Sequence, residues 1–151
     1  MIQRVQTIYL ILAEILLAAM FFLPLAQLIT PEGKSFVLNW NGILSSDGQL
    51  VLNAYPLAIL LAAILILNIV IIFLFKNRVL QMRICIYNIL LMVGSLVMIW
   101  FYSYQAGKEF QVEKFFKIPA LFPIMAAFLT FLAFRAIRKD ELLIKSIDRI
   151  R

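Results

Sequence analysis

Four long apolar runs, separated by polar segments, dominate the pattern along the chain. A helix needs roughly 20 apolar residues to cross the hydrocarbon core of a bilayer, because the core is about 30 Å thick and a helix rises about 1.5 Å per residue. An open strand cannot do the same, since its backbone groups would stay unpaired in lipid. The pattern therefore predicts four membrane-spanning helices, at about residues 8–28, 54–75, 84–104 and 118–134.

The connection between the first two predicted spans, residues 30–53, carries signals typical of strands. Ser35–Trp40 reads as a short strand, and the dipeptides Asn41-Gly42 and Asp47-Gly48 are of the hairpin type. The segments that flank Asp47-Gly48 predict a small β-hairpin. The first apolar run follows Arg4 and is too long for a signal peptide, so we expect an uncleaved anchor.

Composition supports a membrane protein. Of 151 residues, 64% are hydrophobic and 15% charged, whereas a soluble domain has about 45–50% apolar and about 25% charged residues. A soluble core of this size cannot bury that surplus, so part of it faces lipid. The length suits one membrane domain over residues 1–151, which ends in a tail at residues 135–151.

Lysine and arginine are distributed unevenly between the two sides of the predicted spans. The N-terminus, the short connection 76–83 and the tail together hold ten, and the other two connections hold four. The positive-inside rule places the side with ten in the cytoplasm. The expected fold is thus an all-α four-transmembrane-helix bundle with both termini inside and a small β-hairpin in the first outer loop.

Several kinds of chemistry are disfavoured. The chain has one cysteine, Cys85, and no histidine, which removes most zinc, haem, iron–sulfur and Cys/His catalytic arrangements. Nucleotide-binding, serine-nucleophile and metalloprotease motifs are missing from the sequence. The net charge is +6, and the charged residues lie beside the apolar runs, which favours anionic lipid over nucleic acid as a partner. We expect no enzyme, no cofactor, no metal and no nucleic-acid partner.

One acid, Glu14, lies inside the first predicted span, where a charge costs at least a few kcal/mol. Asn68, Asn88 and Thr130 lie at a similar depth in the other three spans, toward the cytoplasmic side. Two interpretations follow. Either the four residues form a buried polar cluster that fixes helix register, which we favour, or Glu14 serves a proton- or ion-coupled site.

Two segments are candidate contact surfaces. Trp40 is expected near the outer headgroups, and the tail carries basic residues that flank an apolar face. The tail either continues the last span as a helix, lies on the inner leaflet against anionic headgroups, or only sets topology and solubility. The basic residues concerned are Arg138, Lys139, Lys145, Arg149 and Arg151.

Several stretches carry a resemblance to a known family. They are Met1–Leu10, Phe21–Leu25, Tyr55–Ile59, Phe75–Arg78 with Gln81, Arg135–Glu141 and Asp148–Arg151. The chain resembles, from end to end, an uncharacterised family of bacterial inner-membrane proteins, a domain-of-unknown-function group from Bacteroidota; Ile150 stands where the family usually has leucine. The resemblance implies four spans and a bacterial inner membrane, and it implies no activity.

Three functions stay open. The favoured one is a non-enzymatic scaffold or accessory subunit that binds another envelope protein, or a second copy of the chain, through the hairpin loop or the basic tail. The second is a small transporter or channel subunit that uses Glu14. The third, a membrane enzyme acting on lipid, has the least support, because no nucleophile–base pair is visible.

Overall fold

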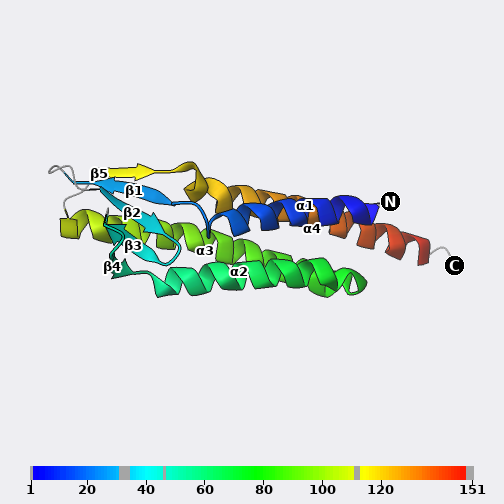
Figure 1. Ribbon diagram of the computed structural model, residues 1–151. Coiled ribbons are helices and arrows are strands. Elements are labelled where there is room, and N and C mark those ends of the chain that lie inside the picture. The colour runs from blue at the N-terminus through cyan, green and yellow to red at the C-terminus, as the bar shows by residue number, and fades with distance from the viewer. Residues whose placement is uncertain (1, 31–34, 46, 111–112, 149–151) are drawn as a thin grey trace.

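Over the residues that the structure describes, the fold combines four α-helices with a five-stranded antiparallel sheet (Figure 1). The computed structural model describes residues 2–30, 35–45, 47–110 and 113–148. The helices run side by side, the sheet lies at one end of them, and both ends of the chain lie at the other (Figure 1). The elements are α1 (Ile2–Ala19), β1 (Ala26–Ile29), β2 (Ser35–Asn39), β3 (Gly42–Ser45), β4 (Leu50–Asn53), α2 (Tyr55–Phe73), η1 (Leu74–Lys76), α3 (Arg78–Phe110), β5 (Glu113–Phe116), η2 (Ile118–Leu121) and α4 (Phe122–Asp148).

The sheet corrects the predicted all-α fold. Its strand order is β4-β3-β2-β1-β5, with every neighbouring pair antiparallel. The strand predicted at Ser35–Trp40 is confirmed as β2, and the predicted hairpin is present as β3 and β4. The prediction of a helix bundle with only a small hairpin is nevertheless wrong, because β1 and β5 complete a sheet of five strands.

β1 explains the largest error. The first span was predicted to continue to residue 28, but α1 ends at Ala19 and residues 26–29 form a strand. Pro24 precedes this strand, and its fixed φ and missing N–H disfavour a continuing helix. β1 pairs with β2 on one side and with β5 on the other, so its backbone is satisfied without a helix.

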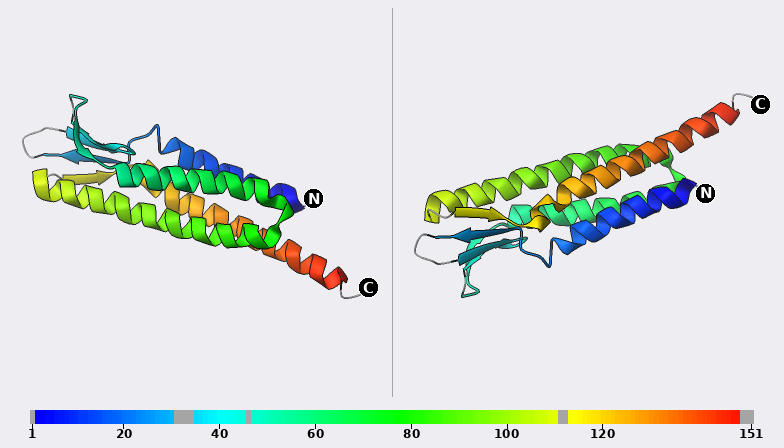
Figure 2. Two further views of the ribbon diagram at one scale, coloured as in Figure 1. Left: turned by 90° about the horizontal axis from the view of Figure 1, so that it is seen from below. Right: turned by 90° about the horizontal axis from the view of Figure 1, so that it is seen from above.

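The face of the sheet that is buried packs against the last part of α3. Leu28, Leu38 and Ile43 come from three neighbouring strands and are fully buried. They share one hydrophobic core with Tyr102 and Ala106 of α3, and Figure 2 shows α3 running along the sheet. Alternate positions of β1 and β2 are half-buried, as the period-2 geometry of a strand requires.

Among the described residues, three helical segments are long and apolar enough to cross a membrane. They are Tyr55–Phe73, Arg78–Lys108 and Ile118–Leu143, whereas the apolar part of α1 is the shorter segment Val5–Ala19. Many large apolar side chains on them are exposed, including Ile59, Ile66 and Leu90, which suits contact with lipid. α3 has 33 residues and is about 50 Å long at about 1.5 Å per residue, so it extends well beyond a hydrocarbon core of about 30 Å.

Candidate functional site

The four polar residues predicted to lie at one depth divide the hydrophobic core in two. One cluster of buried side chains lies toward the sheet and the other toward the chain ends. In every helix the polar residue lies between a residue of one cluster and a residue of the other. The successions along the chain are Leu10–Glu14–Leu17, Ile64–Asn68–Ile71, Cys85–Asn88–Met92 and Ala126–Thr130–Ala133. We call Glu14, Asn68, Asn88 and Thr130 the polar layer.

Within the polar layer, Asn68 connects α2 to α1. Its Nδ2 donates one hydrogen bond to the carboxylate Oε2 of Glu14 at 2.8 Å and one to the backbone carbonyl of Leu10 at 3.0 Å. Asn68 is fully buried, and Glu14 is half-buried beside it. Both donors of one amide are therefore used, which holds Glu14 in place.

The other two members behave differently. The Thr130 hydroxyl donates to the carbonyl of Ala126 in its own helix at 2.8 Å. Asn88 is fully buried, and neither its Nδ2 nor its Oδ1 has a hydrogen-bond partner among the described residues. The structure thus brings Glu14 and Asn68 into contact and places Asn88 and Thr130 at the same level without a bond between helices. Such a layer can fix register, and Asn88 retains unused hydrogen-bonding capacity.

The predicted contact residues lie far apart. Trp40 follows β2 in the turn to β3, and its ring packs on Phe21 with centroids 5.3 Å apart. Arg138 and Lys139 are exposed on α4, and Lys145 belongs to the same helix. Of the alternatives for the tail, the structure shows the continuous one, since α4 runs from Phe122 to Asp148 and projects past the other helices (Figure 2). Arg149 and Arg151 lie outside the described residues.

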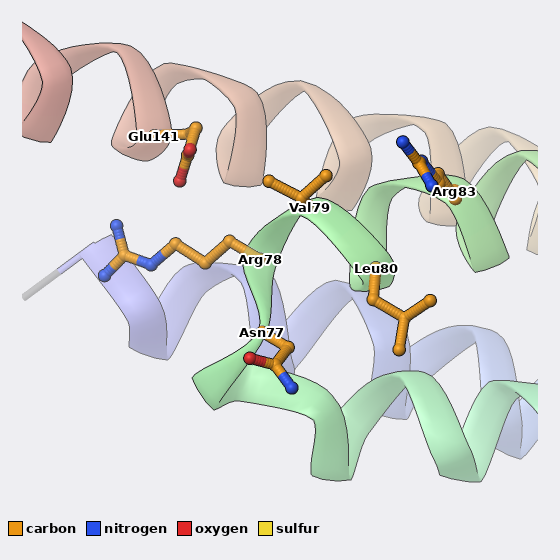
Figure 3. A pocket seen from close by; sticks show the side chains of 6 residues that line it. All are labelled: Asn77, Arg78, Val79, Leu80, Arg83 and Glu141. Atoms are coloured by element: carbon orange, nitrogen blue, oxygen red, sulfur yellow. The ribbon is translucent and has the colours of Figure 1, made fainter.

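A pocket at the chain-end side of the helices was missed by sequence reasoning. It has a volume of about 440 Å³ and lies where the turn after α2 meets α3 and α4 (Figure 3). We call it the turn pocket; its lining residues are Asn77, Arg78, Val79, Leu80, Arg83 and Glu141. From the sequence, Arg78 and Arg83 were interpreted only as residues that set the membrane topology. Glu141 comes from a distant part of the chain.

An ion pair beside the turn pocket ties three helices together. Arg78 Nη1 lies 3.7 Å from Asp140 Oδ2, and Gln6 Nε2 donates to the same oxygen at 3.3 Å. Gln81 closes the end of α2 by donating to the carbonyl of Ile71 at 2.9 Å. The wall of the turn pocket is thus held by contacts from α1, α2, α3 and α4.

At the opposite end, β4 is an edge strand of the sheet. Its partner is β3, with a register shift that leaves Val51 between the paired residues Leu50 and Leu52 as a β-bulge. Leu50 and Val51 are each 43% exposed. An apolar strand edge is therefore accessible at the end of the molecule that carries the sheet.

These features define a class of protein that combines helices and a sheet. Three of the described helices are long and apolar enough to cross a membrane, and the sheet packs on the last part of one of them, α3. A family model described as Domain of unknown function (DUF4293) matches residues 2–150, and the chain belongs to this family. No curated protein matches the sequence.

Proposed function

We propose that the protein is a non-enzymatic scaffold or accessory subunit of a bacterial inner membrane, and that it binds another envelope protein through the edge of its sheet. The observation that carries this proposal is edge strand β4, with its exposed Leu50 and Val51. Proteins rarely expose apolar strand edges to water, because such an edge can pair with a strand of another chain or contact another protein.

The length of α3 supports a position of this edge outside the bilayer. The sheet packs on the last turns of α3, near Tyr102 and Ala106. If the first part of α3 spans the hydrocarbon core, these last turns lie beyond it by simple helix length. β4 then presents its apolar side chains to the aqueous space, where a protein partner, and not lipid, is available to cover them.

The distribution of charge supports an orientation. The chain-end side carries ten lysines and arginines by sequence position and the sheet side carries four. We therefore place the chain ends in the cytoplasm and the sheet on the outer face of the inner membrane, an orientation in which the shorter α1 crosses the bilayer beside the three longer helices. The resemblance to bacterial inner-membrane proteins supports the compartment, and the single buried Cys85 and the lack of histidine in the sequence support the non-enzymatic assignment.

The direct experiment is site-specific photocrosslinking in native membranes. A photoreactive amino acid at position 51 is expected to give a discrete protein adduct, which mass spectrometry identifies. Position 97, an exposed valine within α3, is the matched control and is expected to give lipid adducts only. A partner-sized band at position 51 supports the proposal, a band of twice the chain mass assigns the edge to a second copy, and identical patterns at both positions contradict it.

A second candidate function, a proton- or ion-coupled transporter or channel subunit, rests on the polar layer. Glu14 brings a carboxyl group to Asn68, and Asn88 has two polar atoms at the same level that are unpaired within the part of the chain that the structure describes. The test is proton flux into proteoliposomes across a pH gradient. Glu14→Gln is expected to abolish flux if this candidate holds, while Thr130→Val, which alters a hydroxyl bonded within its own helix, leaves it intact. Equal flux in both variants and wild type removes the candidate.

A further inference from the structure

We propose that the turn pocket binds the headgroup of a zwitterionic phospholipid of the phosphoethanolamine type. The pocket combines two guanidinium groups, one carboxylate, one amide and two apolar side chains. A phosphoethanolamine lipid presents the complementary set, namely a phosphate, a primary ammonium and an apolar glycerol–acyl region. The inference does not depend on the scaffold function.

The arginines of the turn pocket provide the positive charge for the phosphate. Arg83 is exposed, and Arg78 reaches along the opposite side of the pocket (Figure 3). Arg78 is held by Asp140 at 3.7 Å, which is too long for a close bidentate pair and leaves donors of its guanidinium for another acceptor. Guanidinium groups bind phosphate through charge-assisted hydrogen bonds with matching planar geometry.

Glu141 supplies the site for the ammonium group. It descends from α4 toward the beginning of α3 and faces the space between the two helices (Figure 3). A carboxylate has about four lone-pair sites, so it can accept an ammonium N–H in addition to a partner in the protein. The turn pocket thus offers positive charge for a phosphate and negative charge for an ammonium group.

Val79 and Leu80 provide the apolar side. They are 47% and 46% exposed on the first turn of α3, and both line the turn pocket. The pocket adjoins the end of α2, whose last residue, Phe73, is an exposed apolar side chain. This is the level at which a headgroup meets the acyl region, so a lipid can reach the pocket while its chains stay in the bilayer.

Glu141 also distinguishes this headgroup from the alternatives. A phosphoglycerol headgroup offers the same phosphate to the arginines, but its terminal group is a neutral glycerol, which can donate hydrogen bonds to Glu141 without neutralising the negative charge. A choline headgroup has no N–H to donate. A primary ammonium both donates hydrogen bonds and neutralises the acid. The expected order of association is phosphoethanolamine first, with phosphoglycerol and phosphocholine lipids below it.

The experiment uses full-length protein in phosphocholine bilayers that contain spin-labelled lipid of one headgroup type at a time. Electron spin resonance gives the fraction of each labelled lipid that the protein immobilises. The wild-type protein is expected to immobilise a larger fraction of the phosphoethanolamine lipid than of the phosphocholine lipid. Arg83→Gln is expected to lower the association constant of the phosphoethanolamine lipid, relative to phosphocholine, about fivefold. Arg138→Gln is the matched control, because Arg138 is an exposed arginine on α4 that does not line the pocket, and it is expected to change nothing.

Glu141→Gln separates this proposal from simple attraction to basic residues. It is expected to reverse the order, so that the phosphoglycerol lipid associates more strongly than the phosphoethanolamine lipid. Wild type that favours phosphoglycerol lipid, or that shows no preference, overturns the proposal. Equal losses in Arg83→Gln and Arg138→Gln overturn it as well. If soluble phosphoethanolamine at millimolar concentration binds in the absence of any lipid preference, the assignment to a lipid is overturned.

Discussion

Asn68 Nδ2 lies 2.8 Å from Glu14 Oε2, and this bond joins two helices inside the hydrophobic core. The same amide donates to the carbonyl of Leu10, so one buried side chain fixes both a carboxylate and a backbone group of α1. The pair lies where the core changes from one cluster of apolar side chains to the other. Such a contact fixes the position of α1 along the axis of α2, because sliding either helix by one turn breaks both hydrogen bonds.

Replacing Asn68 with leucine is expected to lower the free energy of unfolding by about 1–3 kcal/mol, since it leaves the Glu14 carboxyl without its donor. The measurement is unfolding by sodium dodecyl sulfate in mixed micelles. A double-mutant cycle with Glu14→Leu is expected to give a coupling energy of about 0.6 kcal/mol and at most about 1.7 kcal/mol, the average and the maximum found for hydrogen bonds between membrane helices. Additive effects to within about 0.3 kcal/mol show that the bond does not hold the helices together.

Asn88→Leu is expected to act in the opposite direction. Both polar atoms of Asn88 are buried and have no partner among the residues that the structure describes, so a leucine of similar volume removes a desolvation cost and raises the free energy of unfolding by about 1 kcal/mol or more. Thr130→Val is the comparison, because the Thr130 hydroxyl bonds only within its own helix, and its effect is expected to stay within about 0.5 kcal/mol. If Asn88→Leu destabilises the protein, Asn88 has a bound partner, and the ion-coupled candidate gains support.

Hydropathy predicted α2 well but not the sheet. The span predicted at 54–75 differs from Tyr55–Phe73 by one residue at its start and two at its end. The segment Ala26–Ile29 holds three apolar residues and Gln27, and four such residues do not distinguish strand from helix. What decides their structure is pairing with Leu38 and Phe116, which lie far along the chain, and no local pattern contains that information.

The candidate sites were predictable to different degrees. Counting residues at about 1.5 Å each placed Glu14 and Asn68 at the same depth, and they are in contact. The same counting placed Asn88 at this depth too, but the depth of a residue does not predict whether its side chain has a hydrogen-bond partner. The turn pocket needs Glu141 of α4 beside Arg78 of α3, a packing relationship between segments that only tertiary structure defines.

Gly42 is expected to be the least replaceable of three glycines. Its φ is +150°, and a Cβ there would overlap the carbonyl oxygen of Leu52 in the neighbouring strand. Gly42→Ala is therefore expected to cost about 3 kcal/mol or more, measured by thermal unfolding in detergent. Gly48 has a φ of +75° in open space, and its alanine variant is expected to cost about 1–2 kcal/mol.

Gly94 completes this series as the internal control. It lies within α3, and a Cβ there meets nothing within 4 Å. Gly94→Ala is expected to stabilise the protein by up to about 1 kcal/mol, because alanine favours a helix over glycine. If Gly42→Ala matches Gly48→Ala in cost, the β3–β4 hairpin relaxes around the new Cβ, and the tight approach of the two strands is not a constraint.

The proposed orientation predicts opposite accessibility for the two ends of the molecule. Cysteines placed singly at Asp47, in the loop between β3 and β4, and at Lys139, on α4, are both exposed. With Cys85 changed to alanine, a membrane-impermeant maleimide added to cells with a permeabilised outer membrane is expected to label position 47 at once. Position 139 is expected to react only after lysis, because the charge distribution places it in the cytoplasm.

Wild type is the control for this labelling, since Cys85 is fully buried among apolar side chains of α1, α2 and α4 and is expected to stay unlabelled before and after gentle lysis. Reaction of position 139 before lysis, with position 47 protected, reverses the orientation and places the turn pocket on the outer face. The sheet edge would then face the cytoplasm, and the partner of β4 would have to be sought there. Labelling of both positions before lysis contradicts the placement of the two ends of the molecule on opposite sides of the bilayer.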